Sequence, residues 1–200
     1  MDTGLIHIYC GDGKGKTTAA MGLALRSLGH GRRVLIAQFL KDGRSGELAA
    51  LKTFERATVY PAKPISGRPT GELEALKALT QVTVLRGKAM TKFTFQMTAD
   101  EKKETCQAQT TLLQKIQDFC EKHHPDLAVC DELVGACALG LVPEEQVIHF
   151  LKGKPAHTEV VLTGRNPSPA LLDLADYVSE IKKIKHPFDR GIAARIGIEE

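Results

Sequence analysis

Short apolar runs alternate with longer stretches of helical character along the chain. Runs of strand length stand at 5–9, 33–39, 82–85, 127–130, 159–163 and 177–181. Apolar spacing, N-terminal capping residues and closing glycine or proline mark helices at 16–28, 98–122, 143–151 and 168–174. Because strands that alternate with helices usually form parallel sheets, we predict an α/β fold: a mostly parallel sheet with helices on both faces.

The 200 residues are expected to form a single domain with a sizeable core, spanning 1–200. The segment near 55–80 is rich in proline and glycine, and residues 71–77 echo residues 46–52 at an offset of 25. This pattern predicts an exposed segment that is mobile or inserted, with chance similarity as the alternative. The C-terminal stretch 182–200 is predicted to be a polar tail.

The strongest motif is Gly11-Asp12-Gly13-Lys14-Gly15-Lys16-Thr17-Thr18, between the first apolar run and the first predicted helix. Strand, glycine-rich turn and helix in this order are typical of a phosphate-binding loop. The backbone N–H groups and the helix N-terminus would face phosphate oxygens. Lys16 would neutralise the phosphates and the Thr17 hydroxyl would ligate Mg²⁺. The first glycine comes one residue later than in the strict pattern, and a turn without a ligand is the alternative.

Two further strand ends are expected to share a crevice with this loop. The apolar run 127–130 leads into Asp131 and Glu132, which is the form of a Walker B element that holds Mg²⁺. A solvated strand end is the alternative, but the upstream loop favours the metal site. Thr163-Gly164-Arg165 follows another strand, and ligands of parallel sheets bind beyond the carboxyl ends of strands.

The role of three other features is open from the residues alone. Arg26 lies nine positions after Thr17, and it would reach the nucleotide or face solvent. Phe93 and Phe95 have the period-two spacing of one strand face, for which core packing is the usual explanation. His186 lies in Lys185-His186-Pro187-Phe188-Asp189, which is either a substrate lip or part of a polar surface.

Composition narrows the class of protein. The net charge is +3 with lysine and arginine spread along the chain, so nothing indicates a nucleic-acid partner. The five cysteines show neither a C-x-x-C pair nor zinc-ligand spacing. An odd cysteine number without a signal peptide predicts a cytoplasmic protein, and the absence of a run of about 20 apolar residues argues against a membrane span.

Taken together, these motifs resemble the phosphate-loop-type corrinoid adenosyltransferases, the ATP:cob(I)alamin or cob(I)yrinic acid a,c-diamide adenosyltransferases. The resemblance covers nearly the whole chain, and it includes the late first glycine of the loop. The other matching segments are 22–26, 38–41, 92–95, 131–132, 162–165, 175–180, 185–192 and 197–199. It implies a RecA-like phosphate-loop NTPase architecture.

The resemblance also implies a reaction and its participants. Family members transfer the 5′-deoxyadenosyl group of MgATP to cobalt(I) of a reduced corrinoid and release triphosphate, in adenosylcobalamin biosynthesis or salvage. By position, residues 11–18, Arg26 and Arg165 would contact ATP. Phe93, Phe95 and His186 would contact the corrinoid, although many members carry Trp where this chain has Phe95. A homodimer and a reductase or flavodoxin-type electron donor are further expectations.

Two other functions remain open at this point. One is a phosphate-loop kinase or NTPase that acts on small molecules and releases ADP; the aromatic motif and the His186 segment argue against it. The other is a non-catalytic, ATP-dependent corrinoid carrier or sensor, which would tolerate the loss of magnesium ligands.

Overall fold

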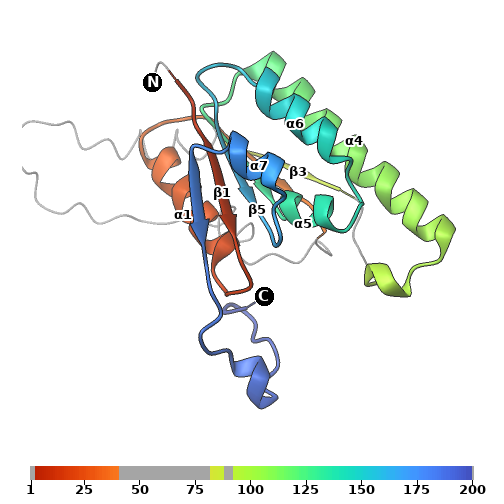
Figure 1. Ribbon diagram of the computed structural model, residues 1–200. Coiled ribbons are helices and arrows are strands. Elements are labelled where there is room, and N and C mark those ends of the chain that lie inside the picture. The colour runs from red at the N-terminus through yellow and green to blue at the C-terminus, as the bar shows by residue number, and fades with distance from the viewer. Residues whose placement is uncertain (1–2, 41–81, 88–91, 200) are drawn as a thin grey trace, which may run out of the picture.

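Six parallel strands form the sheet at the centre of the computed structural model, which describes residues 3–40, 82–87 and 92–199. The strand order is β3-β2-β4-β5-β1-β6, and every pairing is parallel (Figure 1). The strands are β1 (Ile6–Cys10), β2 (Val34–Gln38), β3 (Val82–Arg86), β4 (Leu127–Asp131), β5 (Glu159–Thr163) and β6 (Tyr177–Glu180). The predicted parallel α/β fold is therefore confirmed, and β5 separates the loop-bearing strand β1 from the acidic strand β4.

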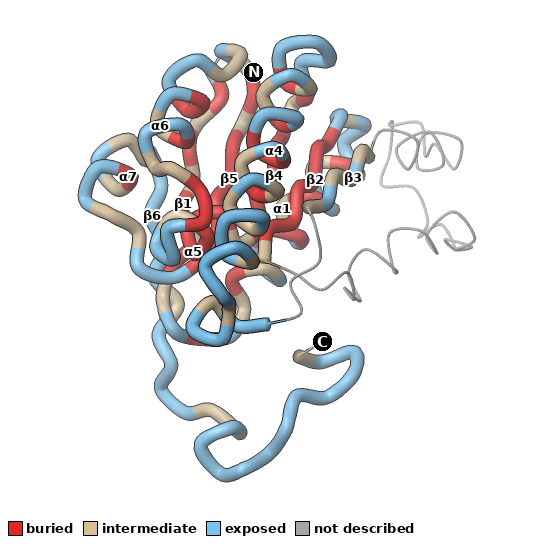
Figure 2. Tube along the Cα trace, turned by 90° about the vertical axis from the view of Figure 1, so that its right-hand side faces the viewer, coloured by how far each residue is buried: buried red, intermediate tan, exposed pale blue. Residues whose placement is uncertain are grey.

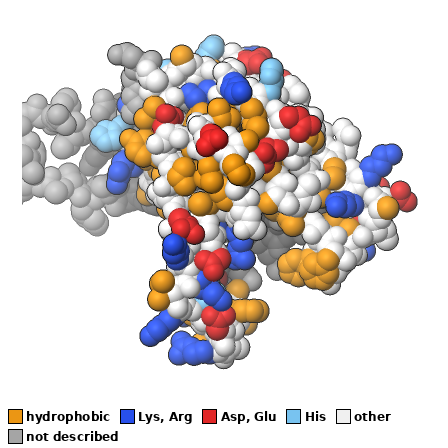
Figure 3. Space-filling view, viewed as in Figure 1, with side chains coloured by type: hydrophobic (Ala, Val, Ile, Leu, Met, Phe, Trp, Pro, Cys, Tyr) orange, Lys and Arg blue, Asp and Glu red, His pale blue; other side chains and the backbone are white. Residues whose placement is uncertain are grey.

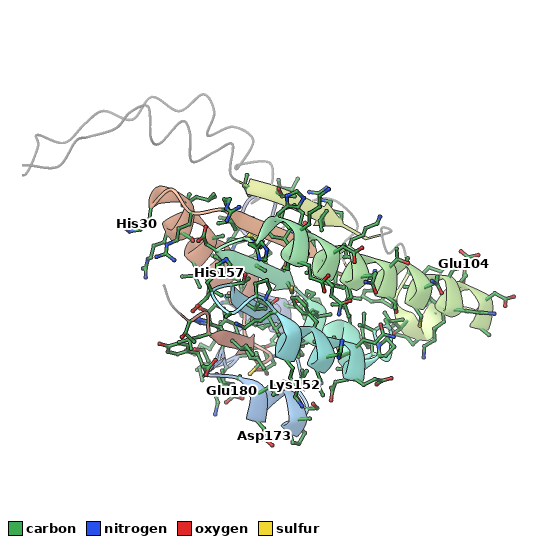
Figure 4. All side chains as sticks on the ribbon, turned by 90° about the horizontal axis from the view of Figure 1, so that it is seen from above. His30, Glu104, Lys152, His157, Asp173 and Glu180 are labelled. Carbon is green, nitrogen blue, oxygen red and sulfur yellow. The ribbon has the colours of Figure 1, made fainter. Side chains whose placement is uncertain are left out.

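Helices cover both faces of this sheet. They are α1 (Lys16–Gly29), α4 (Ala99–His123), α5 (Leu133–Ala138), α6 (Glu144–Gly153) and α7 (Pro169–Leu174), with short 3₁₀ turns η2 (Thr94–Gln96) and η3 (Pro187–Arg190). Among the described elements, α1 packs on one face, and α4 to α7 lie on the opposite face (Figures 1 and 2). The buried strands run between these layers. Polar side chains point outward at the periphery, among them His30, Glu104, Lys152 and Asp173 (Figure 4).

Local sequence signals explain where the helices begin. Thr98 caps α4: its hydroxyl accepts from the backbone N of Glu101 at 3.3 Å, and the Glu101 carboxylate accepts from the backbone N of Thr98 at 2.9 Å. Ser168 caps α7 by accepting from the backbone N of Leu171 at 3.2 Å. Both capping predictions are confirmed, whereas the six-residue helix α5 was not predicted from the sequence.

The turn after β1 lies unusually close to the chain that leaves β6. A Cβ built on Gly11 would lie 2.4 Å from the carbonyl oxygen of Ile181, and one on Gly13 would lie 2.7 Å from the same atom. The backbone N of Gly13 donates to that oxygen at 2.8 Å, and the backbone N of Lys183 donates to the Asp12 carboxylate at 3.0 Å. The glycines are therefore needed for this backbone contact, whatever ligand the loop binds.

Three further sequence predictions concern the segment 55–80, the cysteines and membrane spans. The segment 55–80 and its near-repeat lie outside the described residues. All five cysteines fall inside them, and none of the five is in a disulfide. The helices of the described part of the chain include none that is both long and apolar enough for a membrane span.

We expect Gly11→Ala to lower the free energy of unfolding by about 2 kcal/mol or more, because Gly11 combines a φ of 105° with the 2.4 Å approach. The matched control is Gly22→Ala in α1, where an added Cβ meets no atom within 4 Å. It should raise the free energy of unfolding by about 0.5–1 kcal/mol. Urea unfolding of both variants measures the difference, and equal effects would contradict the close contact.

Candidate functional site

Buried polar side chains gather where the parallel strands end. Within the described residues, Gln38 ends β2, Asp131 ends β4 and Thr163 ends β5, and each is less than 4% exposed. Lys16, at the first position of α1, is 7% exposed. Because burying a polar group is costly unless it is bonded, this gathering marks the carboxyl edge of the sheet as a built site rather than a packing accident.

A chain of hydrogen bonds links the loop to two strand ends. The Thr17 hydroxyl donates to Asp131 Oδ1 at 2.8 Å. The Thr163 hydroxyl donates to the same oxygen at 2.8 Å, and it accepts from the backbone N of Glu132 at 2.8 Å. The predicted meeting of the loop with the acidic strand end is therefore present, and Thr163 connects the two acidic residues.

Left-handed backbone also concentrates at this edge. Leu40, Glu132 and Asn166 follow β2, β4 and β5, and their φ angles are 57°, 62° and 55°. Such conformations are unfavourable for residues other than glycine, and they persist where the surrounding structure fixes them. Glu132 is also the N-cap residue of α5, and a Cβ built on Gly135 would lie 2.8 Å from Glu132 Oε2. The acidic side chain is thus held against the first turn of α5.

The loop cation is held inside the loop itself. Lys16 Nζ donates to the carbonyl oxygen of Gly13 at 2.8 Å. Burial lowers the pKa of Lys16, the charge of Glu132 opposes that shift, and the charge of Arg165 adds to it. Arg165 itself is exposed at the end of β5. Lys16 and Arg165 therefore lie within electrostatic reach of each other at one edge, as the sequence predicts.

Asp12 faces the C-terminal segment. The backbone hydrogen bond from Lys183 lowers the pKa of Asp12, and the charges of Lys183 and Arg165 act in the same direction. Lys14 is exposed, and its charge contributes to a Glu199 pKa lowered to about 2, mainly by hydrogen bonds from Arg195. Glu199, near the far end of the tail, is therefore within electrostatic reach of Lys14 in the loop.

Arg26 is not brought to the loop by the helix that carries it. Nine residues of α-helix correspond to about 13.5 Å along the axis from Thr17. The side chain is exposed on α1, and its charge acts on Tyr9 in β1, whose pKa is raised mainly by burial. The assignment of Arg26 to ATP remains a prediction.

Phe93 and Phe95 do not lie on a strand, so the expectation from their period-two spacing is wrong. Phe93 directly precedes η2 and Phe95 lies within it. Their rings stack with centroids 5.5 Å apart and an interplanar angle of 6°. Phe93 is 69% exposed and Phe95 is 82% exposed, so core packing is excluded as well. Exposed hydrophobic surface over η2 is visible at the lower right of Figure 3.

His186 lies in the C-terminal tail, which leaves β6 and extends below the body of the protein (Figures 1 and 2). Its Nδ1 accepts from the backbone N of Phe188 at 3.2 Å, so the ring caps η3. The tail is exposed as predicted, but it is not wholly polar. Its exposed large hydrophobic residues are Ile184, Phe188, Ile192, Ile196 and Ile198.

Sequence reasoning placed Thr163 at the shared crevice but did not foresee its hydrogen bonds to Asp131 and Glu132. It also did not foresee the contact of Ile181 and Lys183 with the loop. A signal for these hydrogen bonds existed, because β2, β4 and β5 each have an apolar stretch followed by one polar residue at the carboxyl end. Nothing in the sequence marks Ile181, because it acts through its backbone. No cluster of three or more His, Cys, Asp or Glu side chains suited to a metal is found in the ranges 3–40, 82–87 and 92–199.

A comparison with solved structures finds a protein with a similar fold. The flagellar accessory protein FlaH from Methanocaldococcus jannaschii aligns with a TM-score of 0.51, over 90% of this chain and 72% of that chain. The sequence identity is 13%, so this likeness concerns the fold alone.

Comparison of sequences is more specific. The family model described as "ATP:corrinoid adenosyltransferase BtuR/CobO/CobP" matches residues 2–199. The corrinoid adenosyltransferase CobA of Salmonella typhimurium is 35% identical over 199 residues, which cover 99% of this chain and 86% of that protein. The corrinoid adenosyltransferase of Pseudomonas aeruginosa is 30% identical over 201 residues, with 99% and 84% covered.

The family model and the relatives match nearly all of this chain, and the phosphate loop joined to an acidic strand end is compatible with an ATP-binding fold. The chain belongs to the ATP:corrinoid adenosyltransferase family.

Proposed function

We propose that this protein transfers the 5′-deoxyadenosyl group of ATP to cobalt(I) of a reduced corrinoid and releases triphosphate. The observation that carries the proposal is the Thr17–Asp131 hydrogen bond of 2.8 Å, which joins the phosphate loop to the acidic strand end in a chain of this family. Gly11 to Thr18 would hold the triphosphate, with Arg165 at its margin, and the assignment of Arg26 to ATP rests on the family resemblance.

The loop is suited to a leaving triphosphate. A desolvated cation interacts more strongly with phosphate than an exposed one, and Lys16 is 7% exposed. Its bond to the Gly13 carbonyl occupies one of the three N–H donors of the ammonium group before the substrate binds. When ATP enters, Lys16 would exchange that carbonyl for phosphate oxygens, so the charge is in place as the carbon–oxygen bond breaks.

The donor atoms at this edge fit Mg²⁺, which prefers hydroxyl and carboxylate oxygens. We propose that Thr17, Asp131 and Glu132 would hold the ion that accompanies ATP. When bound, Mg²⁺ would neutralise charge on the phosphates. The Thr17 hydroxyl donates its proton to Asp131, so its lone pairs are directed away from that carboxylate.

Cobalt(I) is already a strong nucleophile, so the protein's task is to align it with the ribose 5′ carbon. Orientation of this kind supplies up to about 7–11 kcal/mol. We propose that the stacked Phe93 and Phe95 meet the lower face of the corrinoid, where they would displace its axial ligand, and that His186 contributes from the tail. The high exposure of the Phe93 and Phe95 rings supports the corrinoid contact, because exposed paired rings are typical of a binding surface.

The family resemblance also suggests an oligomeric state, a location and an electron donor for this protein. We propose a cytoplasmic homodimer that receives reduced corrinoid from a reductase or flavodoxin-type donor. The exposed hydrophobic residues of the tail and of β6, including Tyr177 at 52% exposure, support a surface that another chain covers.

The overall proposal predicts the products of an anaerobic assay with MgATP and chemically reduced cob(I)alamin. Adenosylcobalamin should form together with one equivalent of triphosphate, because attack at the 5′ carbon expels the intact chain of phosphates. Resolving the phosphate products by ion-exchange chromatography measures this. ADP and orthophosphate without a cobalt–carbon bond would instead indicate a kinase or NTPase.

Glu132→Gln keeps the side-chain volume and removes the charge, so it tests the acidic strand end. We expect kcat to fall about a hundredfold or more, because metal ligation is worth several kcal/mol in the transition state. Corrinoid affinity, measured by titration of the absorbance spectrum, should stay unchanged. Glu121→Gln, on the exposed end of α4, is the control and should match the wild type. Full activity of Glu132→Gln would remove this residue from the site.

Phe95→Ala tests the aromatic pair without disturbing the core, because Phe95 is 82% exposed. The KM for corrinoid should rise while the KM for ATP holds, and the cobalt(II) spectrum of the bound corrinoid should return to that of the free form. Leu25→Ala, which removes a 48% exposed side chain from α1, should leave both unaffected. An unaltered cobalt(II) spectrum in Phe95→Ala would refute the lower-face role.

A further inference from the structure

We propose that Thr163 is a positioning residue that fixes Asp131 and Glu132 for the metal–nucleotide complex. The inference deepens the proposed function and rests on it. Thr163 is fully buried at the end of β5. Its hydroxyl donates to Asp131 Oδ1 at 2.8 Å and accepts from the backbone N of Glu132 at 2.8 Å, so one side chain holds both acidic residues.

The donor and acceptor roles in the hydrogen bonds of Thr163 are fixed by the groups involved. A hydroxyl has one proton, and Thr163 gives it to Asp131 because the Glu132 backbone N can only donate. Asp131 Oδ1 thus receives two protons, one from Thr17 and one from Thr163. Two donors that converge on one oxygen fix the rotation of the Asp131 carboxylate. Asp131 is fully buried, so solvent does not supply a substitute for either donor.

The bond to Glu132 acts on the backbone. Glu132 has a φ of 62°, and its backbone N–H points to Thr163 rather than into α5. A left-handed residue is stable only where its neighbours fix it. Anchoring of this N–H therefore sets the direction in which the Glu132 side chain leaves the strand end. Thr163 acts through these two residues, since nothing requires it to touch the substrate itself.

Thr158 shows what a purely structural threonine looks like in the same strand region. It is also fully buried, but its hydroxyl donates to the backbone carbonyl oxygen of Pro125 at 2.7 Å. It lies just before β5, at the end of the strand opposite to Thr163. Replacement of either threonine by valine removes one buried hydroxyl and keeps the shape. Thr158→Val is therefore a matched control for the loss of stability.

The experiment measures ATP affinity of the full-length protein by calorimetry, once with Mg²⁺ and once with EDTA. The ratio of the two dissociation constants reports how strongly the metal supports nucleotide binding. We expect Thr163→Val to lower this ratio about ten- to hundredfold, the usual effect of removing a group that orients a metal ligand. Thr163→Ser keeps the hydroxyl and should restore most of it, and Thr158→Val should leave it unchanged.

Two results would overturn the inference about Thr163. An unchanged ratio in a folded Thr163→Val protein would show that the two bonds are dispensable. Equal losses in Thr163→Val and Thr158→Val would assign both to stability alone. If Thr163→Val does not fold, Thr163→Ala, which introduces no larger group, is measured in its place. The adenosyl-transfer assay on the wild type runs in parallel, so failure of the reaction itself is recognised separately from failure of the role of Thr163.

Discussion

A buried carboxylate at the end of β4 constrains the whole edge of the sheet. Asp131 is fully buried, and a charge in that position is tolerated only with hydrogen-bond donors around it. The two donors come from different elements, Thr17 from α1 and Thr163 from β5. The cost of burying this charge therefore fixes three elements relative to one another. The loop faces the acidic strand end before any nucleotide arrives.

The other side of the loop is held by the chain that leaves β6, through backbone atoms of Ile181 and Lys183. Gly11 and Gly13 approach Ile181 too closely for any side chain, and the Gly13 N–H is committed to the Ile181 carbonyl. The Gly13 amide can therefore meet phosphate only if it leaves the Ile181 carbonyl. Glycines in a phosphate loop are usually explained by the approach of the ligand, but in this fold the segment after β6 already requires two of them. The tail thus begins at a point that is rigidly connected to the site.

The sequence was sufficient for the strands, for most helices and for the residues of the loop, because periodicity and caps are local properties. Strand order is not local, so the insertion of β5 between β1 and β4, and with it the role of Thr163, needed the structure. Helix α5 was missed because six apolar residues, LVGACA, show no helical period. The spacing of Phe93 and Phe95 misled for a related reason: two residues two apart fit a strand face, but they also fit the approach to a 3₁₀ turn.

Local contacts hold η2 in a conformation that leaves the Phe93 and Phe95 rings exposed. The backbone N of Phe93 donates to Gln96 Oε1 at 3.2 Å, and Lys92 pairs with Glu101, which also caps α4 through Thr98. The rings are thus anchored to a 25-residue helix and still left in water. Burying a phenylalanine side chain stabilises a protein by about 1.5–3 kcal/mol relative to leaving it exposed. Folding gains no such stabilisation from Phe93 or from Phe95, because both rings are exposed. A flat hydrophobic ligand that covers both rings would recover it on binding, which couples ligand affinity to surface that folding leaves exposed.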